Sequence, residues 1–282
     1  LKEGEQMRAE DLIKAVCVVS GNDAAVALGE HLAGSEEAFV ERMNARAKEL
    51  GMNDTHFLNC TGLPAEGHVT SAYDIALMSR ELILHHPDIR RFTTIWMDSL
   101  RGGESLLVNT NKLVRFYPGA TGLKTGSTSS AKYCISATAE KDGMELIAVV
   151  LGGSTSDKRF ADAKALLNYG FASYALVTVV PESPLPAVPV TLGTQKTVQA
   201  VLTENNALLL EKSRAGSLTQ SLSLPDRVEA PVSAGEPLGS LDVFDAEGAL
   251  VSSLPLLAGE DVPRVTWRQL FRRCVETAFC AR

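Results

Sequence analysis

Several features that would assign this 282-residue chain to a protein class are missing from its sequence. The longest uninterrupted apolar run is residues 146–151, far short of the roughly 20 residues that a membrane-spanning helix needs. No apolar segment typical of a signal peptide follows Leu1. Positive charge is also scarce, because 27 Lys and Arg face 34 Asp and Glu. The resulting net charge of −7 argues against general nucleic-acid binding, which requires a basic face.

The cysteines and histidines form no pattern typical of a metal site or a disulfide framework. The five cysteines include neither a C-x-x-C pair nor a zinc spacing, and their number is odd. Cys17 and Cys134 lie in apolar stretches, so we expect them to be buried thiols. His56 and Cys60 are four residues apart, but no second pair accompanies them. The sequence therefore predicts no bound metal and no cofactor.

The first part of the chain has the apolar period of helices. This period predicts helices over residues 9–19, 24–33 and 35–51, with Gly21-Asn22-Asp23 interrupting the first two. Ser35 is expected to cap the third helix and Gly51 to end it. Ser71-Ala72-Tyr73-Asp74 has the form of a capping box, which would open a further helix.

The period changes at about residue 133. Residues 133–139 and 145–151 indicate two strands joined by a turn at Lys141-Asp142-Gly143. Residues 146–151 are apolar without alternation, which predicts a strand that is covered on both faces. A helix over about residues 156–174 follows. Helices packed on an antiparallel sheet predict an α+β domain, to which we assign residues 1–176.

Proline and glycine recur between short segments in the rest of the chain. Four of the 12 prolines fall within residues 181–189, which predicts a stiff linker between domains. Short β-like runs recur beyond it, and they predict a small all-β domain over residues 177–263. These runs are residues 197–202, 207–210, 218–224, 241–244 and 249–256.

Residues 264–282 have a different composition and predict an amphipathic helix. Its apolar stripe follows helical spacing through Trp267, Leu270, Phe271, Cys274, Val275, Ala278 and Phe279. The segment is basic, with Glu276 against Arg264, Arg268, Arg272, Arg273 and Arg282. A basic face opposite an apolar stripe is what a helix at a membrane surface needs. We favour a membrane anchor, and the alternative is a helix docked on its own domain.

Two short polar motifs lie about a hundred residues apart, Ser20-Gly21-Asn22 and Lys124-Thr125-Gly126. Each is weak alone, and the first could be a plain turn between helices. In this order they are two of the three signatures of penicillin-recognising serine acyl-transferases, S-x-N and K-T-G. The third, S-x-x-K, carries the nucleophile and is expected before S-x-N, where no such motif occurs.

The sequence resembles the low-molecular-weight penicillin-binding proteins, which are D-alanyl-D-alanine carboxypeptidases of peptidase family S11. The resemblance covers essentially the whole chain, with similar segments at residues 20–33, 53–57, 61–63, 122–128 and 151–153. It implies an enzyme that removes the terminal D-alanine from peptidoglycan stem peptides through an acyl-enzyme. It also implies binding of β-lactam antibiotics and a location at the extracytoplasmic face of the bacterial cell membrane.

The resemblance assigns roles to the residues of the two motifs. Ser20 would relay a proton between the missing lysine and Lys124, and Asn22 would bind a substrate carbonyl. Lys124 and Thr125 would bind the terminal carboxylate of the substrate. Gly126 would let the substrate backbone approach closely.

Two further residues receive roles in the same way. The backbone N–H of Ser127 would be a donor of the oxyanion hole. Arg159 would help to bind the substrate carboxylate, and the alternative for this residue is a solvated arginine at the start of a helix.

The one S-x-x-K in the chain is Ser129-Ser130-Ala131-Lys132. It lies between K-T-G and a strand, so we predict a turn there instead of a nucleophile helix. We therefore expect roughly a hundred preceding residues that carry the catalytic S-x-x-K, and we expect residues 1–282 alone to be inactive. Two alternatives remain, a class A β-lactamase and a cell-wall-binding pseudoenzyme.

Overall fold

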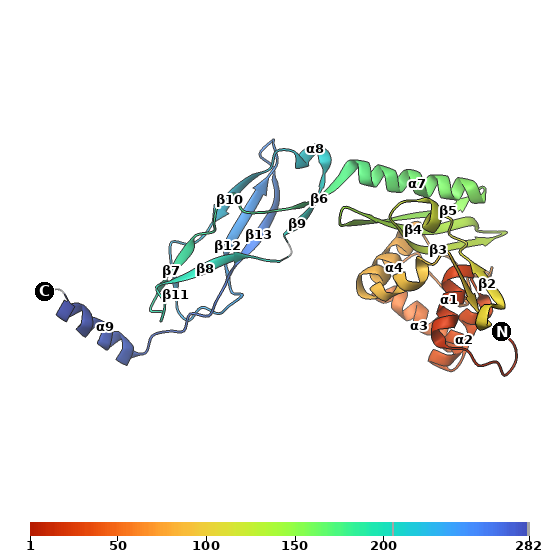
Figure 1. The fold of residues 1–282 in the computed structure, drawn as a ribbon, viewed down its shortest axis with the longest axis horizontal. Coiled ribbons are helices and arrows are strands. Elements are labelled where there is room, and N and C mark those ends of the chain that lie inside the picture. Colours follow the sequence, from red (N-terminus) through yellow and green to blue (C-terminus); the bar gives the residue numbers. More distant parts are fainter. Residues whose placement is uncertain (205, 281–282) are drawn as a thin grey trace. The chain divides into compact units, whose positions relative to one another are not determined.

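The computed structural model describes residues 1–204 and 206–280. The chain divides into two compact units, Leu1–Ala172 and Ser173–Arg282. The first unit combines helices with antiparallel strands, and the second is rich in strands (Figure 1). The prediction of an α+β fold followed by a small β-rich part is confirmed.

Helices make up the first half of unit 1, as the apolar period predicts. Ser35 and Ser71 cap two of them, since each hydroxyl accepts a backbone N–H three residues on at 3.2 Å. The predicted capping box at Ser71 is only half formed, because the Asp74 carboxylate accepts bonds from the Asp54 N–H and the Thr55 hydroxyl instead. Asp74 thereby ties the loop after one helix to the start of the next. The helices are α1 (Ala9–Val19), α2 (Asn22–Ala33), α3 (Glu36–Glu49) and α4 (Ala72–His85).

Short elements connect α4 to the main sheet of unit 1. They include a hairpin whose buried residues Leu100 and Leu107 pack against α1. The connecting elements are η1 (Pro87–Ile89), α5 (Arg90–Thr93), β1 (Met97–Leu100), η2 (Arg101–Gly103), β2 (Ser105–Val108) and α6 (Leu113–Phe116).

The main sheet of unit 1 has three antiparallel strands in the order β3-β4-β5, between α4 and α7. Alternate residues of β4, Ile135 and Ala137 among them, are buried against Phe160 of α7. On the other face the Ser136 hydroxyl lies 2.7 Å from that of Ser79 on α4. The predicted pair of strands and the helix after them are confirmed. Their bounds are β3 (Ala120–Thr128), β4 (Lys132–Lys141), β5 (Met144–Gly153) and α7 (Ser156–Ser173).

Strand β5 lies at an edge of this sheet within the described part of the chain. Helices cover both of its faces, as predicted, but the cover is incomplete. Ala148 is buried, whereas Leu151 is 37% exposed. The outer edge of β5 therefore presents unpaired backbone groups that a further strand could join.

Unit 2 is built from two sheets, a pair β6-β9 and a six-stranded sheet in the order β10-β12-β13-β8-β7-β11. The proline-rich residues 181–189 are not a linker between domains, because β7 begins at Ala187 and buries Val188 and Val190. Strand β6, which precedes them, already pairs within unit 2. All five predicted β-like runs are confirmed as strands. The elements are β6 (Tyr174–Thr178), β7 (Ala187–Thr191), β8 (Thr197–Leu202), β9 (Ala207–Glu211), α8 (Lys212–Ala215), β10 (Thr219–Ser223), β11 (Val228–Glu229), β12 (Pro237–Phe244) and β13 (Leu250–Ala258).

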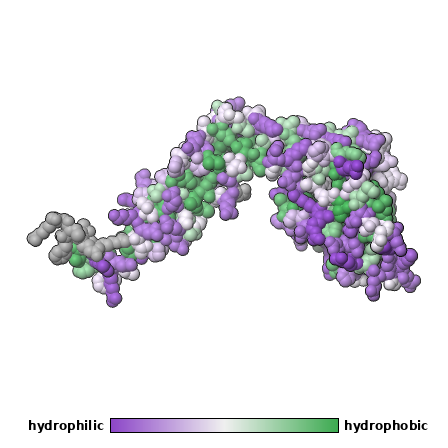
Figure 2. All heavy atoms as spheres, in the orientation of Figure 1, coloured by the Kyte–Doolittle hydropathy of each residue, from purple (hydrophilic) through white to green (hydrophobic). Residues whose placement is uncertain are grey.

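The surface of unit 2 is not uniformly polar. Figure 2 shows hydrophobic residues, in green, at the surface of this unit. The cross-strand pair Leu176 and Leu209 is 40% and 56% exposed, and Leu250 is 57% exposed.

The predicted terminal helix is present as α9 (Trp267–Cys280). Its described apolar side chains are open to solvent, with Trp267 73% and Phe271 66% exposed. Among the described residues, no helix is long and apolar enough to cross a membrane. The remaining side chains of the predicted stripe and basic face lie outside the described residues, namely Arg273, Cys274, Glu276, Ala278, Phe279 and Arg282.

Candidate active site

A sharp turn after α1 presents Ser20. Its backbone adopts φ 59° and ψ 44°, a left-handed conformation that is uncommon for a residue with a side chain. Helix α2 begins directly afterwards, so the interruption is Ser20-Gly21 and not the predicted Gly21-Asn22-Asp23. Asn22 and Asp23 instead fill the first turn of α2, where free N–H groups favour short polar and acidic side chains. Asn22 is exposed, and its amide makes no hydrogen bond to another described residue.

Lys124 lies on β3 opposite this turn and bridges the two motifs. Its ammonium group donates a hydrogen bond to the Ser20 hydroxyl, 104 residues away in sequence. In the strand register Lys124 pairs with Ser136, whose side chain faces α4. The structure thus brings together the serine of S-x-N and the lysine of K-T-G.

The surroundings of Lys124 change its acid–base chemistry. Burial lowers the pKa of its amino group from 10.5 to about 8; the nearby Cys17 opposes this change, and the charge of Arg159 adds to it. An amine with a pKa near neutrality can hold a carboxylate as a cation and can also exchange a proton. Cys17 itself is only partly buried, and burial raises the pKa of its thiol to about 11.

Of the other two residues of K-T-G, Thr125 lies in the interior and Gly126 at the surface. Thr125 is 6% exposed, and its hydroxyl lies 2.7 Å from that of Thr110. Gly126 faces open space, because a Cβ built on it would have no neighbour within 4 Å. Ser127 follows it at the surface, beside a cavity of about 490 Å³. The strand therefore leaves room for another backbone where Gly126 lies.

Arg159 lies beneath this strand, at the start of α7. Its guanidinium donates to the backbone carbonyls of Gly126 and Cys134, each at 3.1 Å, and stacks 4.6 Å from the ring centre of Phe160. The residue is 5% exposed, and its burial lowers the pKa of the guanidinium. Arg159 is thus neither solvated nor open to the surface; it holds β3 and β4 together next to K-T-G.

The segment Asn109-Thr110-Asn111 contributes contacts that sequence reasoning missed. The Thr110 N–H donates to the carbonyl of Val18, in the last turn of α1, at 3.0 Å. Asn111 is 1% exposed and donates to the Gly122 carbonyl at 2.9 Å. This segment therefore joins the helix before Ser20 to the strand of Lys124. An N-x-N pattern after an apolar strand was the only signal in the sequence.

The one S-x-x-K of the chain is a turn, as predicted. Residues 129–131 connect β3 to β4, and Lys132 begins β4 with φ 56°. Ser129 and Lys132 therefore do not share a helix face. Cys134, expected to be buried, is only partly so, and its thiol donates to the Ala131 carbonyl at 3.3 Å.

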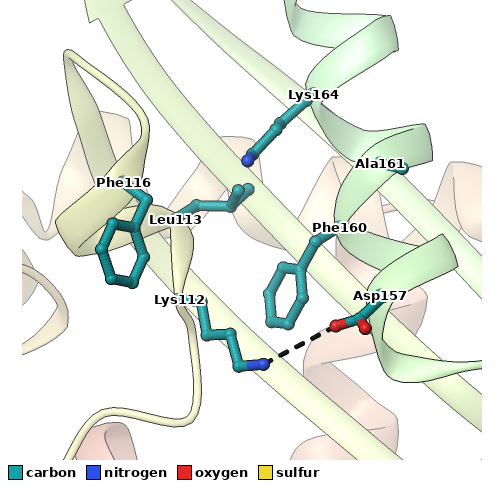
Figure 3. Close-up of a pocket in the computed structure, with 7 residues that line it drawn as sticks. All are labelled: Lys112, Leu113, Phe116, Asp157, Phe160, Ala161 and Lys164. Atoms are coloured by element: carbon teal, nitrogen blue, oxygen red, sulfur yellow. Dashed lines mark ion pairs between the residues drawn. The ribbon is translucent and has the colours of Figure 1, made fainter.

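A second cavity, of about 310 Å³, lies between α6 and α7 (Figure 3). Figure 3 shows Lys112, directly before α6, and Lys164 of α7 at this cavity, with Leu113 and Phe160 between them. Lys112 pairs with Asp157 at 3.6 Å. None of the residues assigned to the site from the sequence lines this cavity.

The described residues contain no cluster of three or more side chains suited to hold a metal. His56 bridges to Val69 through its backbone, and the Cys60 thiol donates to Glu36 at 3.2 Å. This i, i+4 pair is therefore engaged in loop structure.

Comparison with known proteins identifies relatives of both units. The family model of D-alanyl-D-alanine carboxypeptidases, peptidase S11, matches residues 1–155, and the penicillin-binding protein 5 C-terminal domain matches residues 178–264. D-alanyl-D-alanine carboxypeptidase DacF of Bacillus subtilis is 39% identical over 278 residues, covering 97% of this chain and 71% of that protein. The corresponding DacC of Escherichia coli is 33% identical, covering 93% of this chain and 66% of that protein.

Solved structures of penicillin-binding proteins are also similar to this chain. Penicillin-binding protein 5 from Haemophilus influenzae superposes with a TM-score of 0.76 at 28% identity, covering 94% of this chain and 77% of that chain. Penicillin-binding protein D2 from Listeria monocytogenes, solved with cefotaxime bound, has a TM-score of 0.55 at 38% identity, covering 58% of this chain and 67% of that chain.

A peptidase unit followed by a penicillin-binding protein 5 C-terminal domain defines the class as a penicillin-binding protein. The chain belongs to peptidase family S11, the D-alanyl-D-alanine carboxypeptidases. It spans between 66% and 71% of the length of the two curated relatives named above.

Proposed function

We propose that the protein carrying this chain is a serine-type carboxypeptidase that removes the terminal D-alanine from peptidoglycan stem peptides. The observation that carries the proposal is the hydrogen bond from Lys124 to Ser20, which joins the two motifs across unit 1. The family and the names of its relatives support the same reaction.

In the proposed reaction, a serine oxygen attacks the peptide carbonyl, D-alanine leaves with a proton, and water hydrolyses the resulting ester. The attacking serine belongs to an S-x-x-K segment that residues 1–282 do not provide on a helix. The Ser20 hydroxyl relays the proton to the leaving amine, and Asn22 binds a substrate carbonyl. The Lys124 ammonium binds the terminal carboxylate, assisted by Thr125 and by Arg159, which holds the strand from below.

β-Lactam antibiotics present a carboxylate and an acylating carbonyl in the same arrangement, so we propose that they react at this site. The N–H of Ser127 would stabilise the oxyanion in both reactions, a contribution worth about 3 kcal/mol of barrier. The open space above Gly126 gives the ligand backbone access to the strand.

The test is Lys124→Ala in the complete protein. Peptide turnover and penicillin acylation should both fall, because both ligands use this charge. Lys112→Ala is the matched control, since Lys112 lines the other cavity and is more than half exposed, and it should leave both rates unchanged. Normal penicillin labelling of Lys124→Ala, with its fold retained, would remove Lys124 from the site.

We further propose that α9 holds the protein on the extracytoplasmic face of the membrane. Its exposed Trp267 and Phe271, with Arg268 next to them, suit an interfacial helix. The intact chain should bind vesicles containing anionic lipid, and a protein ending at Pro263 should remain in solution. Equal partitioning of both proteins would favour a docked helix instead.

A further inference from the structure

The direction of β3 determines where the rest of a bound peptide lies. Under the proposed function, Lys124 holds the terminal carboxylate and the N–H of Ser127 holds the attacked carbonyl. Substrate residues before that carbonyl therefore continue past Ser127, toward the end of β3 at Thr128. Among the described residues the outer edge of β3 pairs with no strand, so an extended peptide has access to it.

The end of β3 opens into the cavity of about 490 Å³ noted above. Its lining contains one cation and no carboxylate: Ser127, Thr128, Ser129, Lys132 and Tyr133. The Tyr133 ring forms one wall and is held in place from below, because the Arg159 guanidinium lies 5.6 Å from the ring centre.

Lys132 occupies a backbone position that favours glycine. It follows the three-residue loop 129–131 with φ 56°, the left-handed conformation that glycine adopts without steric strain. Its side chain is exposed and makes no ion pair or hydrogen bond with another described residue. Neither the turn nor the packing therefore accounts for a lysine here.

We propose that this cavity is a subsite for the residue that precedes D-alanyl-D-alanine, and that the Lys132 ammonium binds a free carboxylate on that residue. The inference rests on the proposed carboxypeptidase function. It adds that the enzyme selects stem peptides with an acidic third residue over those whose third residue is neutral or basic.

The test compares three acylated peptides that end in D-alanyl-D-alanine and carry glutamate, glutamine or lysine before it. In the complete protein, kcat/KM should be highest for the glutamate peptide, by about threefold to fivefold over glutamine, as an exposed ion pair allows. The preference should shrink at high salt. Lys132→Gln should abolish the preference, and Lys132→Glu should reverse it toward the lysine peptide.

Lys48→Gln is the matched control, because it removes the same charge from an exposed position on α3 and should keep the preference. Lys132→Gly should lose the preference while its melting temperature rises, since it relieves the left-handed backbone. Penicillin acylation should be equal in the wild type and Lys48→Gln, because the control position on α3 lies outside the site.

An equal kcat/KM for all three peptides in the wild type, or an unchanged preference in Lys132→Gln, would overturn the subsite. A wild-type protein that neither hydrolyses peptide nor reacts with penicillin would instead refute the proposed function. In that case the ratio of Kd values for the glutamate and glutamine peptides, measured by calorimetry on the same proteins, still decides the role of Lys132.

Discussion

Burial of the charged Lys124 amino group lowers the free energy of unfolding of unit 1. The substitution Lys124→Met should make this loss measurable. The Lys124 amino group has a pKa of about 8 in the folded protein against 10.5 for an exposed lysine. One pKa unit is worth about 1.4 kcal/mol, so the fold disfavours the charged form by about 3 kcal/mol. Methionine avoids this penalty but loses the hydrogen bonds to Ser20 and to the Thr125 carbonyl, each worth about 1 kcal/mol. We expect the free energy of unfolding of unit 1 to rise by about 1 kcal/mol at pH 7, while acylation is lost.

The pH dependence gives the decisive signature. Lys124 loses its proton near pH 8 in the folded state and near pH 10.5 in the unfolded state. Between these values the unfolded state binds more protons, so the stability of the wild type rises with pH. The advantage of Lys124→Met should thus be complete below pH 8 and vanish at about pH 9, and by about pH 10.5 the variant should be less stable than the wild type, because only the loss of the two hydrogen bonds remains. Urea unfolding at pH 7 and pH 10, with Lys112→Met as an exposed control, measures it. A variant that is less stable at pH 7, or whose advantage does not change with pH, would refute the reasoning.

Three further outcomes are expected. Thr110→Val should lower unfolding stability by about 1–3 kcal/mol and slow acylation, because the buried Thr125 hydroxyl loses its partner, and Thr110→Ser should restore both. Gly239→Ala should destabilise unit 2 by more than about 2 kcal/mol in thermal unfolding, since its Cβ would lie 2.1 Å from the Ser223 carbonyl oxygen, yet leave acylation intact. Residues 1–282 alone should show no mass shift with penicillin, and an adduct on Ser129 or Ser20 would contradict that expectation.

The sequence predicted the longer helices and seven of the strands, because their signals are local, but it did not predict β1, β2, β3, β6, β7 or β11. Apolar period and capping serines gave the helices, and strand runs between Gly and Pro gave the sheets. The predictions that were wrong concern residues whose tertiary contacts outweigh the preference of the local sequence. Asp74 fits a capping box, but the loop at Asp54 takes its carboxylate. Pro189 suggests a linker, yet its neighbours Val188 and Val190 bury their side chains and turn the segment into a strand.

Only the residues of the S-x-N and K-T-G motifs could be predicted as parts of the candidate site. Ser20 and Lys124 were paired through the order of S-x-N and K-T-G. No sequence rule indicated that Thr110 would join α1 to β3, because its partners Val18 and Thr125 are distant in sequence. The change in the pKa of Lys124 could not be predicted either, since it follows from burial in the assembled unit.

The left-handed backbone at Ser20 has an evolutionary consequence. Glycine would relax this position by about 1 kcal/mol, and a single nucleotide change in some serine codons encodes it. The substitution Ser20→Gly therefore arises readily by mutation, and it stabilises the fold. A lineage that carries it would fold better and lose the hydroxyl that Lys124 contacts. Purifying selection at this codon is thus expected to act through peptidase activity, and its relaxation would be an early genetic mark of a homologue that has ceased to be an enzyme.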